Sequence, residues 1–384
     1  MNRIDISEIR RGLHPDRTSA DVIRGCYVDE RGEIISMFSH SLLTLPQEEA
    51  EKYLALFRKV LSGVPGKNLV EIPFRPDQVA EGEEHRLLTA LKDTSLKVDQ
   101  AVEKFFHKVI DALAFEGNYV ILLMHDDHDV AWRPRDEMKV DDAPAGDVFS
   151  HILCAVCPVK QTRPALSYCA DDRTFHDREL DWVVSAPDLG FLFPAFEDGG
   201  ANIYAAMCYS RDASDAHEDF VDAVFGGDAP MPAAAQKETF EALLSDSLED
   251  ECALEVVQTV HEQIRDLVEE RKADKQAEPA TVTKREVSSM LAECGVSEEK
   301  VAAFETRYDE EFGPTDLRAE NIVDVKRFEL RTPDVVVKVN PERSDLIQTR
   351  TIDGSRYILI RADEGVEVNG VNISISDLGE DVEE

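Results

Sequence analysis

The chain has 384 residues, and its 79 Asp and Glu against 42 Lys and Arg give a formal net charge of −37. Apolar residues make up 43% of the sequence, an ordinary globular share that can build the cores of about two or three domains. This net charge argues against a protein that binds nucleic-acid phosphates or anionic membranes, because both functions need surfaces rich in Lys and Arg. We therefore expect no nucleic-acid partner and no membrane partner.

The sequence predicts a cytoplasmic protein. Its first residues, MNRIDISEIRRGL, mix acidic and basic side chains and contain no apolar run typical of a signal peptide. The longest apolar runs, 119–124 and 152–159, are far shorter than the roughly 18 residues that a membrane span needs. The seven cysteines are an odd number, and several stand in apolar segments, which favours free thiols in a reducing compartment.

Residues 1–232 predict an α+β main domain. Two short strands at 26–29 and 34–38 flank a compact turn and indicate a hairpin. A helix is expected between Pro46 and Gly63, where apolar residues recur at helical spacing. A second amphipathic helix is expected at 102–113, because its apolar residues lie on one face of a 3.6-residue period.

The sheet of this domain is expected to be mostly antiparallel. The apolar runs at 119–124 and 152–159 are short and continuous, which indicates central strands covered on both faces. No helical stretch separates the strands that follow, and this favours α+β over a doubly wound α/β sheet. These further strands are expected at 181–185, 190–193 and 203–209.

Beyond Pro232 the composition changes to helix formers and predicts a helical segment at 233–270. Residues 271–282 lack apolar periodicity and indicate a solvated linker. A helical hairpin is expected at 283–313, because Thr283 with Glu286 forms a capping-box pattern at its start.

The spacing of the apolar residues then changes to a period of two, which predicts a small β domain at 321–377. Asp353-Gly354 and Asn369-Gly370 stand between short apolar strands, and these dipeptides are typical of type I′ hairpin turns. Residues 378–384 form an acidic tail that we expect to be frayed.

Seven separated stretches, in order along almost the whole chain, carry a family resemblance. They are 25–33, 61–74, 115–130, 152–168, 182–204, 295–313 and 332–350. Together they resemble a bacterial cytoplasmic family catalogued as domain of unknown function 4317. The resemblance implies no particular activity, cofactor or catalytic residue.

The candidate metal ligands are His125, Asp127, His128 and Asp129, in the run His125-Asp126-Asp127-His128-Asp129 after a predicted strand. A loop at the end of a strand can aim imidazole and carboxylate groups at one ion. Strand alternation would instead separate His125, Asp127 and Asp129 from the other two residues. We favour a polar strand exit and loop without metal, because the chain offers no matching remote ligand pair.

Cys154 and Cys157 form a CxxC pattern, which suggests a redox pair or half of a zinc site. Cys169 and Cys208 could complete four thiolates. Residues three apart in a strand face opposite sides, and the surroundings are apolar, so we favour inert core thiols.

Two further segments have an ordinary structural interpretation. Residues 63–68 resemble a phosphate-binding loop, but the first glycine and the hydroxyl residue of that motif are missing, so a turn after a helix is expected. The aromatic segment 188–196 is either a core strand or the wall of a ligand pocket, and the core interpretation is favoured because Phe is chiefly buried.

The sequence as a whole favours a non-catalytic cytoplasmic protein-interaction or regulatory protein without cofactor, whose partner is another protein. A DNA mimic that presents carboxylates to a basic protein is a variant of this hypothesis. The alternative is a metal-assisted hydrolase or other enzyme with a site near residues 125–129. The sequence indicates no catalytic residue and no oligomeric state.

Overall fold

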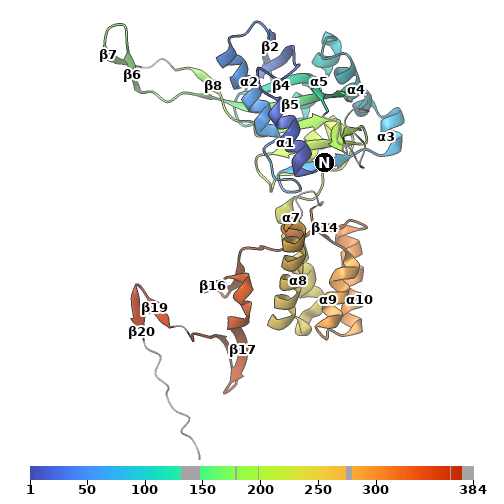
Figure 1. Ribbon diagram of the computed structural model, residues 1–384, viewed down its shortest axis with the longest axis vertical. Helices are drawn as coiled ribbons and strands as arrows, with labels where there is room; N and C mark the ends of the chain where they lie inside the picture. The colour runs from blue at the N-terminus through green and yellow to red at the C-terminus, as the bar shows by residue number, and fades with distance from the viewer. Residues whose placement is uncertain (131–147, 178–179, 198, 274–278, 364, 374–384) are drawn as a thin grey trace, which may run out of the picture. The chain divides into compact units, whose positions relative to one another are not determined.

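A computed structural model describes residues 1–130, 148–177, 180–197, 199–273, 279–363 and 365–373. The chain divides into two compact units, Met1–Gln236 and Lys237–Glu384, which are called the first and second unit below. The predicted α+β class is confirmed, with a large antiparallel sheet, helices in the middle of the chain and small hairpins near its end (Figure 1). Residues 274–278 of the expected linker and the expected tail 378–384 lie outside the described residues.

The first unit is built on an eight-stranded antiparallel sheet. Seven strands follow the order β2-β1-β4-β5-β9-β12-β3, and β8 pairs with the far end of β5. The strands are β1 (Val22–Val28), β2 (Ile34–Ser41), β3 (Leu69–Pro73), β4 (Tyr119–Asp129), β5 (Val148–Gln161), β8 (Trp182–Val184), β9 (Leu189–Phe193) and β12 (Ala205–Ser210).

Helices cover both faces of this sheet and give the first unit two apolar cores. One core lies under α4, α5 and α6, and the other lies under α1 and α2. In β4, Ile121 and Leu123 enter the first core, while Val120, Leu122 and Met124 enter the second, so the expected burial of this strand on both faces is confirmed. The helices are α1 (Arg3–Gly12), α2 (Gln47–Val60), α3 (Pro76–Glu81), α4 (Glu83–Asp93), α5 (Asp99–Ala112) and α6 (Glu218–Phe225).

Two small hairpins in the first unit were not expected from the sequence. β6 (Leu166–Cys169) pairs with β7 (Thr174–Asp177), and β10 (Ala195–Glu197) pairs with β11 (Gly200–Asn202). β5 runs past the neighbouring strands, and together with β8 it carries the β6–β7 hairpin away from the rest of the first unit (Figure 1). Residues 159–184 are called the arm below.

The second unit begins within α7 (Ala233–Leu248) and contains α8 (Leu254–Ala273), which contacts both α9 and α11. The expected helical hairpin is formed by α9 (Lys284–Glu293) and α10 (Glu298–Phe312), and Lys284 Nζ lies 2.7 Å from Asp309 Oδ1. Thr283 and Glu286 form the predicted capping box. The short elements β13 (Thr281–Val282), β14 (Leu317–Arg318) and α11 (Ala319–Ile322) complete this part.

Three separate two-stranded hairpins follow in the second unit. Asp353 and Asn369 have φ values of 50° each and are followed by glycines with positive φ, as the predicted type I′ turns require. The hairpins are β15 (Phe328–Arg331) with β16 (Val336–Val339), β17 (Ile347–Ile352) with β18 (Ser355–Ile360), and β19 (Val366–Val368) with β20 (Val371–Ile373).

Candidate functional site

The run His125-Asp126-Asp127-His128-Asp129 is the second half of β4. The antiparallel register with β5 continues as far as Asp129, which lies opposite Val148. The expected strand exit and loop at this position is therefore wrong. The reason is that the ladder with β5 holds the polar residues in strand conformation after the apolar run has ended.

The strand separates the candidate ligands onto two faces of the sheet, as alternation predicted. On one face His125 Nε2 lies 2.9 Å from Ser150 Oγ and 3.6 Å from Asp127 Oδ1. Burial lowers the pKa of His125, which favours the neutral imidazole. Asp126 and His128 point to the other face, toward α1 and the segment that follows it.

Asp126 is buried and anchors the segment after α1. Its Oδ1 accepts hydrogen bonds from the backbone N–H of Ser19 at 2.8 Å and from the hydroxyls of Ser19 and Thr18 at 3.0 Å each. The Ser19 hydroxyl in turn accepts a hydrogen bond from the Asp127 N–H at 2.7 Å. The carboxylate is thus engaged in holding the chain against β4.

His151 lies opposite Asp126 on β5 and was not singled out by the sequence. Its Nδ1–H donates to the carbonyl oxygen of Phe149 at 3.2 Å, and the Phe149 ring is stacked on the imidazole at 4.7 Å between centroids. Burial lowers the pKa of His151 to about 4, although the carboxylate of Asp126 acts in the opposite direction. His151 is therefore a neutral core histidine near pH 7.

His128 completes this buried polar group. Its Nε2 lies 3.7 Å from Glu8 Oε1 on α1, and a Cβ added to Gly12 would come within 2.9 Å of its Nδ1. Among the residues that the structure describes, no group of three or more His, Cys, Asp or Glu side chains is arranged to hold a metal ion. The contacts of Asp126 and His128 join α1 and the segment after it to the sheet.

The cysteines of the CxxC pattern lie on opposite faces of β5. Cys154 enters the core under α5, together with Cys208, whereas Cys157 enters the core under α2. Burial raises the pKa of Cys157 and of Cys208 to about 12, so neither is a ready thiolate. Cys169 is on β6 in the arm, so the four cysteines do not form one group.

The two remaining candidate segments serve the fold. In the loop after α2, the Asn68 side chain accepts from the Val64 N–H at 2.7 Å and the Gly66 N–H donates to Leu69 at 2.8 Å, so these groups close a turn. In the aromatic segment, Phe191, Phe193 and Phe196 are all buried, which confirms the core interpretation.

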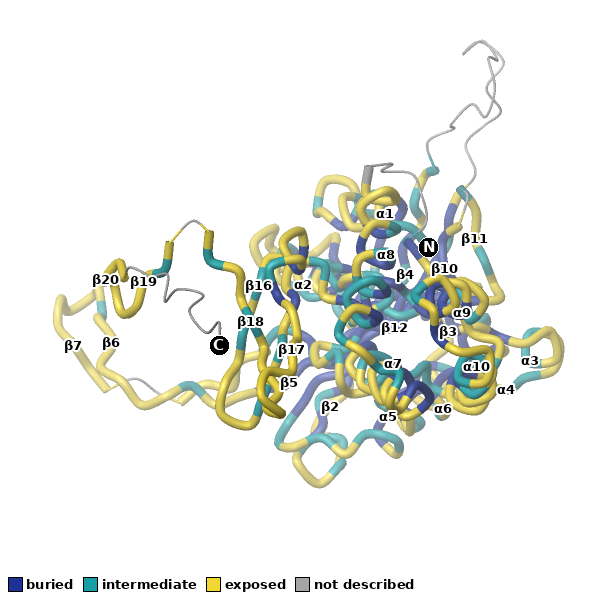
Figure 2. The backbone as a smooth tube through the Cα atoms, turned by 90° about the horizontal axis from the view of Figure 1, so that it is seen from below, coloured by how far each residue is buried: buried dark blue, intermediate teal, exposed yellow. Residues whose placement is uncertain are grey.

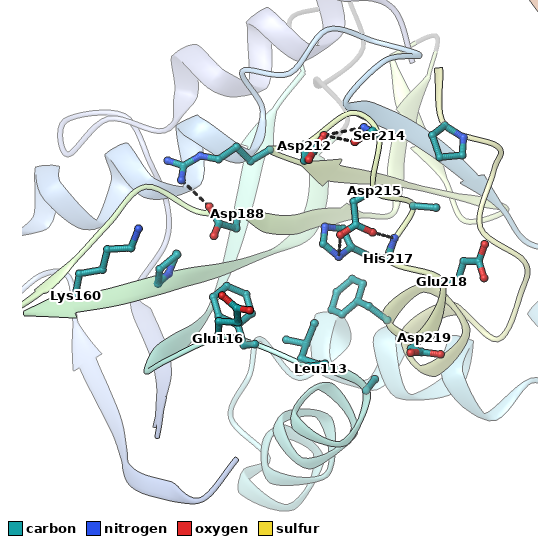
Figure 3. A pocket seen from close by; sticks show the side chains of 18 residues that line it. Leu113, Glu116, Lys160, Asp188, Asp212, Ser214, Asp215, His217, Glu218 and Asp219 are labelled. Atoms are coloured by element: carbon teal, nitrogen blue, oxygen red, sulfur yellow. Dashed lines mark hydrogen bonds and ion pairs between the residues drawn. The ribbon is translucent and has the colours of Figure 1, made fainter. Parts of the chain in front are cut away.

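A pocket of about 880 Å³ opens beside the start of α6 (Figure 3). Its two cationic side chains are Lys160 and Arg211, and Arg211 is paired with Asp188 at 2.7 Å. The acidic residues that line it are Glu116, Asp188, Asp212, Asp215, Glu218 and Asp219. The pocket is wide and acidic, and sequence spacing gave no signal for it.

His217 stands at the edge of this pocket between a serine and an aspartate. Its Nδ1 lies 3.4 Å from Asp215 Oδ2, and its Nε2 lies 3.1 Å from Ser210 Oγ. The arrangement of Ser210, His217 and Asp215 resembles a Ser-His-Asp triad. The Ser210 hydroxyl, however, donates a hydrogen bond to the backbone oxygen of Asp212 at 2.6 Å. The Ser210 hydroxyl proton is therefore used in a hydrogen bond within the turn and is not donated to His217. The three side chains stabilise the turn that leads into α6.

The arm is drawn mostly in the colour of exposed residues (Figure 2), and several of these residues have large apolar side chains. Leu166 is 72% exposed, Phe175 is 63% exposed and Trp182 is 54% exposed. The rings of Tyr168 and Phe175 contact each other across the β6–β7 ladder, with centroids 5.4 Å apart. The other exposed apolar residues of the arm are Leu180, Val183 and Val184.

The arm is continuous with the sheet at its base. β8 pairs with residues 159–161 of β5, and one residue further the Thr162 N–H donates to the Asp181 carbonyl oxygen at 2.8 Å. The sequence indicated only the strand near Trp182, because the strands of the tip are four residues long and their apolar side chains do not enter a core. Within the described chain, no helix has the length and apolar character needed to cross a bilayer.

Comparison with known proteins identifies the family. The model of the family described as domain of unknown function (DUF4317) matches residues 1–371, and the chain belongs to this family. No curated protein and no solved structure matches the chain.

Proposed function

We propose that this member of the DUF4317 family is a non-catalytic interaction protein of the bacterial cytoplasm, and that it contacts another protein through the arm. The observation that carries the proposal is the set of large apolar side chains exposed between Leu166 and Val184. Exposed apolar side chains gathered on one feature mark an interaction surface, whereas isolated ones are ordinary.

The physical reason is that the tip of the arm has no core of its own. A two-stranded hairpin is at best marginally stable in water, and β6 and β7 have only four residues each. Burying one large apolar side chain stabilises a contact by about 1.5–3 kcal/mol. Covering Tyr168, Phe175 and Trp182 would therefore stabilise both the arm and the complex.

The state of the cysteines supports the proposed cytoplasmic location. Cys26, Cys154, Cys157 and Cys208 are free and buried, and the other three cysteines are free as well. A protein with seven unpaired cysteines suits a reducing compartment, where thiols persist.

Photo-crosslinking in living cells tests the proposal. The full chain would carry p-benzoylphenylalanine in place of Phe175 in one sample and in place of Leu43 in the other. Leu43 is the matched control, because it is 80% exposed and lies in the first unit outside the arm. We expect discrete adducts from position 175 and few from position 43. Equal adducts from both positions, or none from position 175, would overturn the proposal.

A further inference from the structure

We infer that the arm joins two copies of this chain, by antiparallel pairing of β6 with β6 of the second copy. This inference rests on the proposed function and names the partner. In the described part of the chain β6 pairs only with β7, so the outer edge of β6 is open. An open edge can add a further strand, and pairing between identical strands is compatible with a twofold axis.

Charge favours the arm as the place where two copies meet. The arm, residues 159–184, carries four basic and five acidic side chains, a net charge of −1, whereas the whole chain has a net charge of −37. Two such acidic molecules repel each other wherever their surfaces approach closely. The arm is nearly balanced in charge and extends away from the sheet (Figure 1), so contact between arms brings apolar groups together with little electrostatic repulsion.

β6 is better suited to this pairing than β7. Its four residues, Leu166 to Cys169, carry no charge. β7 ends with His176 and Asp177, and His176 is engaged with Asp172. Charged side chains on an edge strand discourage pairing, and an uncharged edge permits it.

The side-chain pattern selects one register. Directly opposite residues of an antiparallel pair share a face, and a twofold axis perpendicular to the sheet keeps each side chain on its own face. One residue of β6 therefore lies opposite its own copy, with the axis between the two. With the axis at Ser167, Leu166 lies opposite the partner's Tyr168, and Arg163, which precedes β6, comes near the partner's turn 170–173, which contains Asp171. Arg163 and Asp171 are both exposed, and neither has an ion pair among the described residues.

The neighbouring registers fit less well. An axis at Tyr168 would place Leu166 opposite the partner's Ala170, which lies in the turn after β6. An axis at Leu166 would place Pro164, which has no N–H, opposite the partner's Tyr168. The register at Ser167 also assembles a four-stranded ribbon in which the apolar residues of both copies share one face.

Disulfide trapping tests this register in the full chain. Directly opposite residues have Cα atoms about 4.5–5.5 Å apart, which is within the range of about 4.4–6.8 Å that a disulfide spans. In a Cys169→Ser background, Ser167→Cys should form a covalent dimer under mild oxidation much faster than Leu43→Cys. Equal rates for the two variants would overturn the register.

Charge reversal gives a second test that leaves every core residue in place. The substitution Arg163→Asp places a carboxylate near the partner's Asp171 at each of the two symmetric contacts. We expect it to raise the dimer dissociation constant about tenfold, and we expect the double variant Arg163→Asp with Asp171→Arg to restore it. A double variant as weak as the single one would contradict the pairing.

The experiments separate this inference from the proposed function. A chain that stays monomeric at high concentration, while position 175 crosslinks to a different protein in cells, overturns the second-copy inference alone. The absence of any crosslink from position 175 overturns both. A covalent dimer through Ser167→Cys, together with crosslinks between two copies of this chain, supports both.

Discussion

Asp126 and His151 lie opposite each other on β4 and β5, and both side chains are buried on the same face of the sheet. The carboxylate accepts three hydrogen bonds from Thr18 and Ser19, and the imidazole is neutral. Asp126, in the middle of the run that resembles a metal site in the sequence, therefore attaches the segment after α1 to the sheet.

The first prediction concerns the hydrogen bonds of Asp126. Asp126→Ala removes the shared acceptor of three part-buried hydrogen bonds, so we expect the free energy of unfolding to fall by about 1–3 kcal/mol. Urea denaturation measures this change. Asp127→Ala is the control, because its side chain is 47% exposed, and it should change stability by no more than about 0.5 kcal/mol. Similar effects of the two substitutions would contradict the structural role of Asp126.

The second prediction concerns the pH dependence of stability. The folded pKa of His151 is about 4, below its ordinary value of 6.5. Between these values the unfolded chain binds a proton that the folded chain does not, so stability falls as the pH is lowered, by up to about 1.4 kcal/mol for each pH unit.

The variant His151→Phe should show a shallower decline over the same pH range than the native chain. Carboxylates with lowered pKa values, such as Glu84, contribute a slope of the same sign in both proteins. The difference between the two slopes therefore isolates His151. Identical slopes in denaturant titrations at several pH values would refute its assignment as a buried neutral histidine.

The third prediction concerns the close approach of β9 to its neighbours. A Cβ added to Gly190 would come within 2.4 Å of the Cys154 backbone oxygen and 2.7 Å of a Val60 methyl group. Gly190→Ala should therefore destabilise the first unit by about 1–3 kcal/mol. Gly200→Ala is the control, since its nearest neighbour would be 3.9 Å away. Thermal unfolding of both variants checks the prediction, and an unchanged melting temperature for Gly190→Ala would contradict the packing.

Much of the fold could be predicted because its signals are local. The apolar run in β4 showed a strand buried on both faces, and Asp353-Gly354 showed a turn that needs positive φ at both residues. The Thr283 capping box marked the start of α9, because it too depends only on residues close together in the sequence.

The candidate sites were less predictable because they depend on pairing between distant segments. His151 meets Asp126 only through the β4–β5 register, which the sequence does not specify. The arm escaped detection because a core strand and an uncovered strand can have the same alternation, and only the structure shows that Leu166 and Phe175 lack a covering layer.

The claim that the arm joins two copies is tested most directly by the salt dependence of the dimer dissociation constant, measured by sedimentation of the full chain. Apolar contact between two molecules of charge −37 is opposed by repulsion, which salt screens. The dimer should therefore be tighter at about 0.5 M than at about 0.05 M NaCl, and Tyr168→Ser with Phe175→Ser should abolish it at both concentrations. A chain that is monomeric throughout, or a dimer that these substitutions leave intact, would contradict the account.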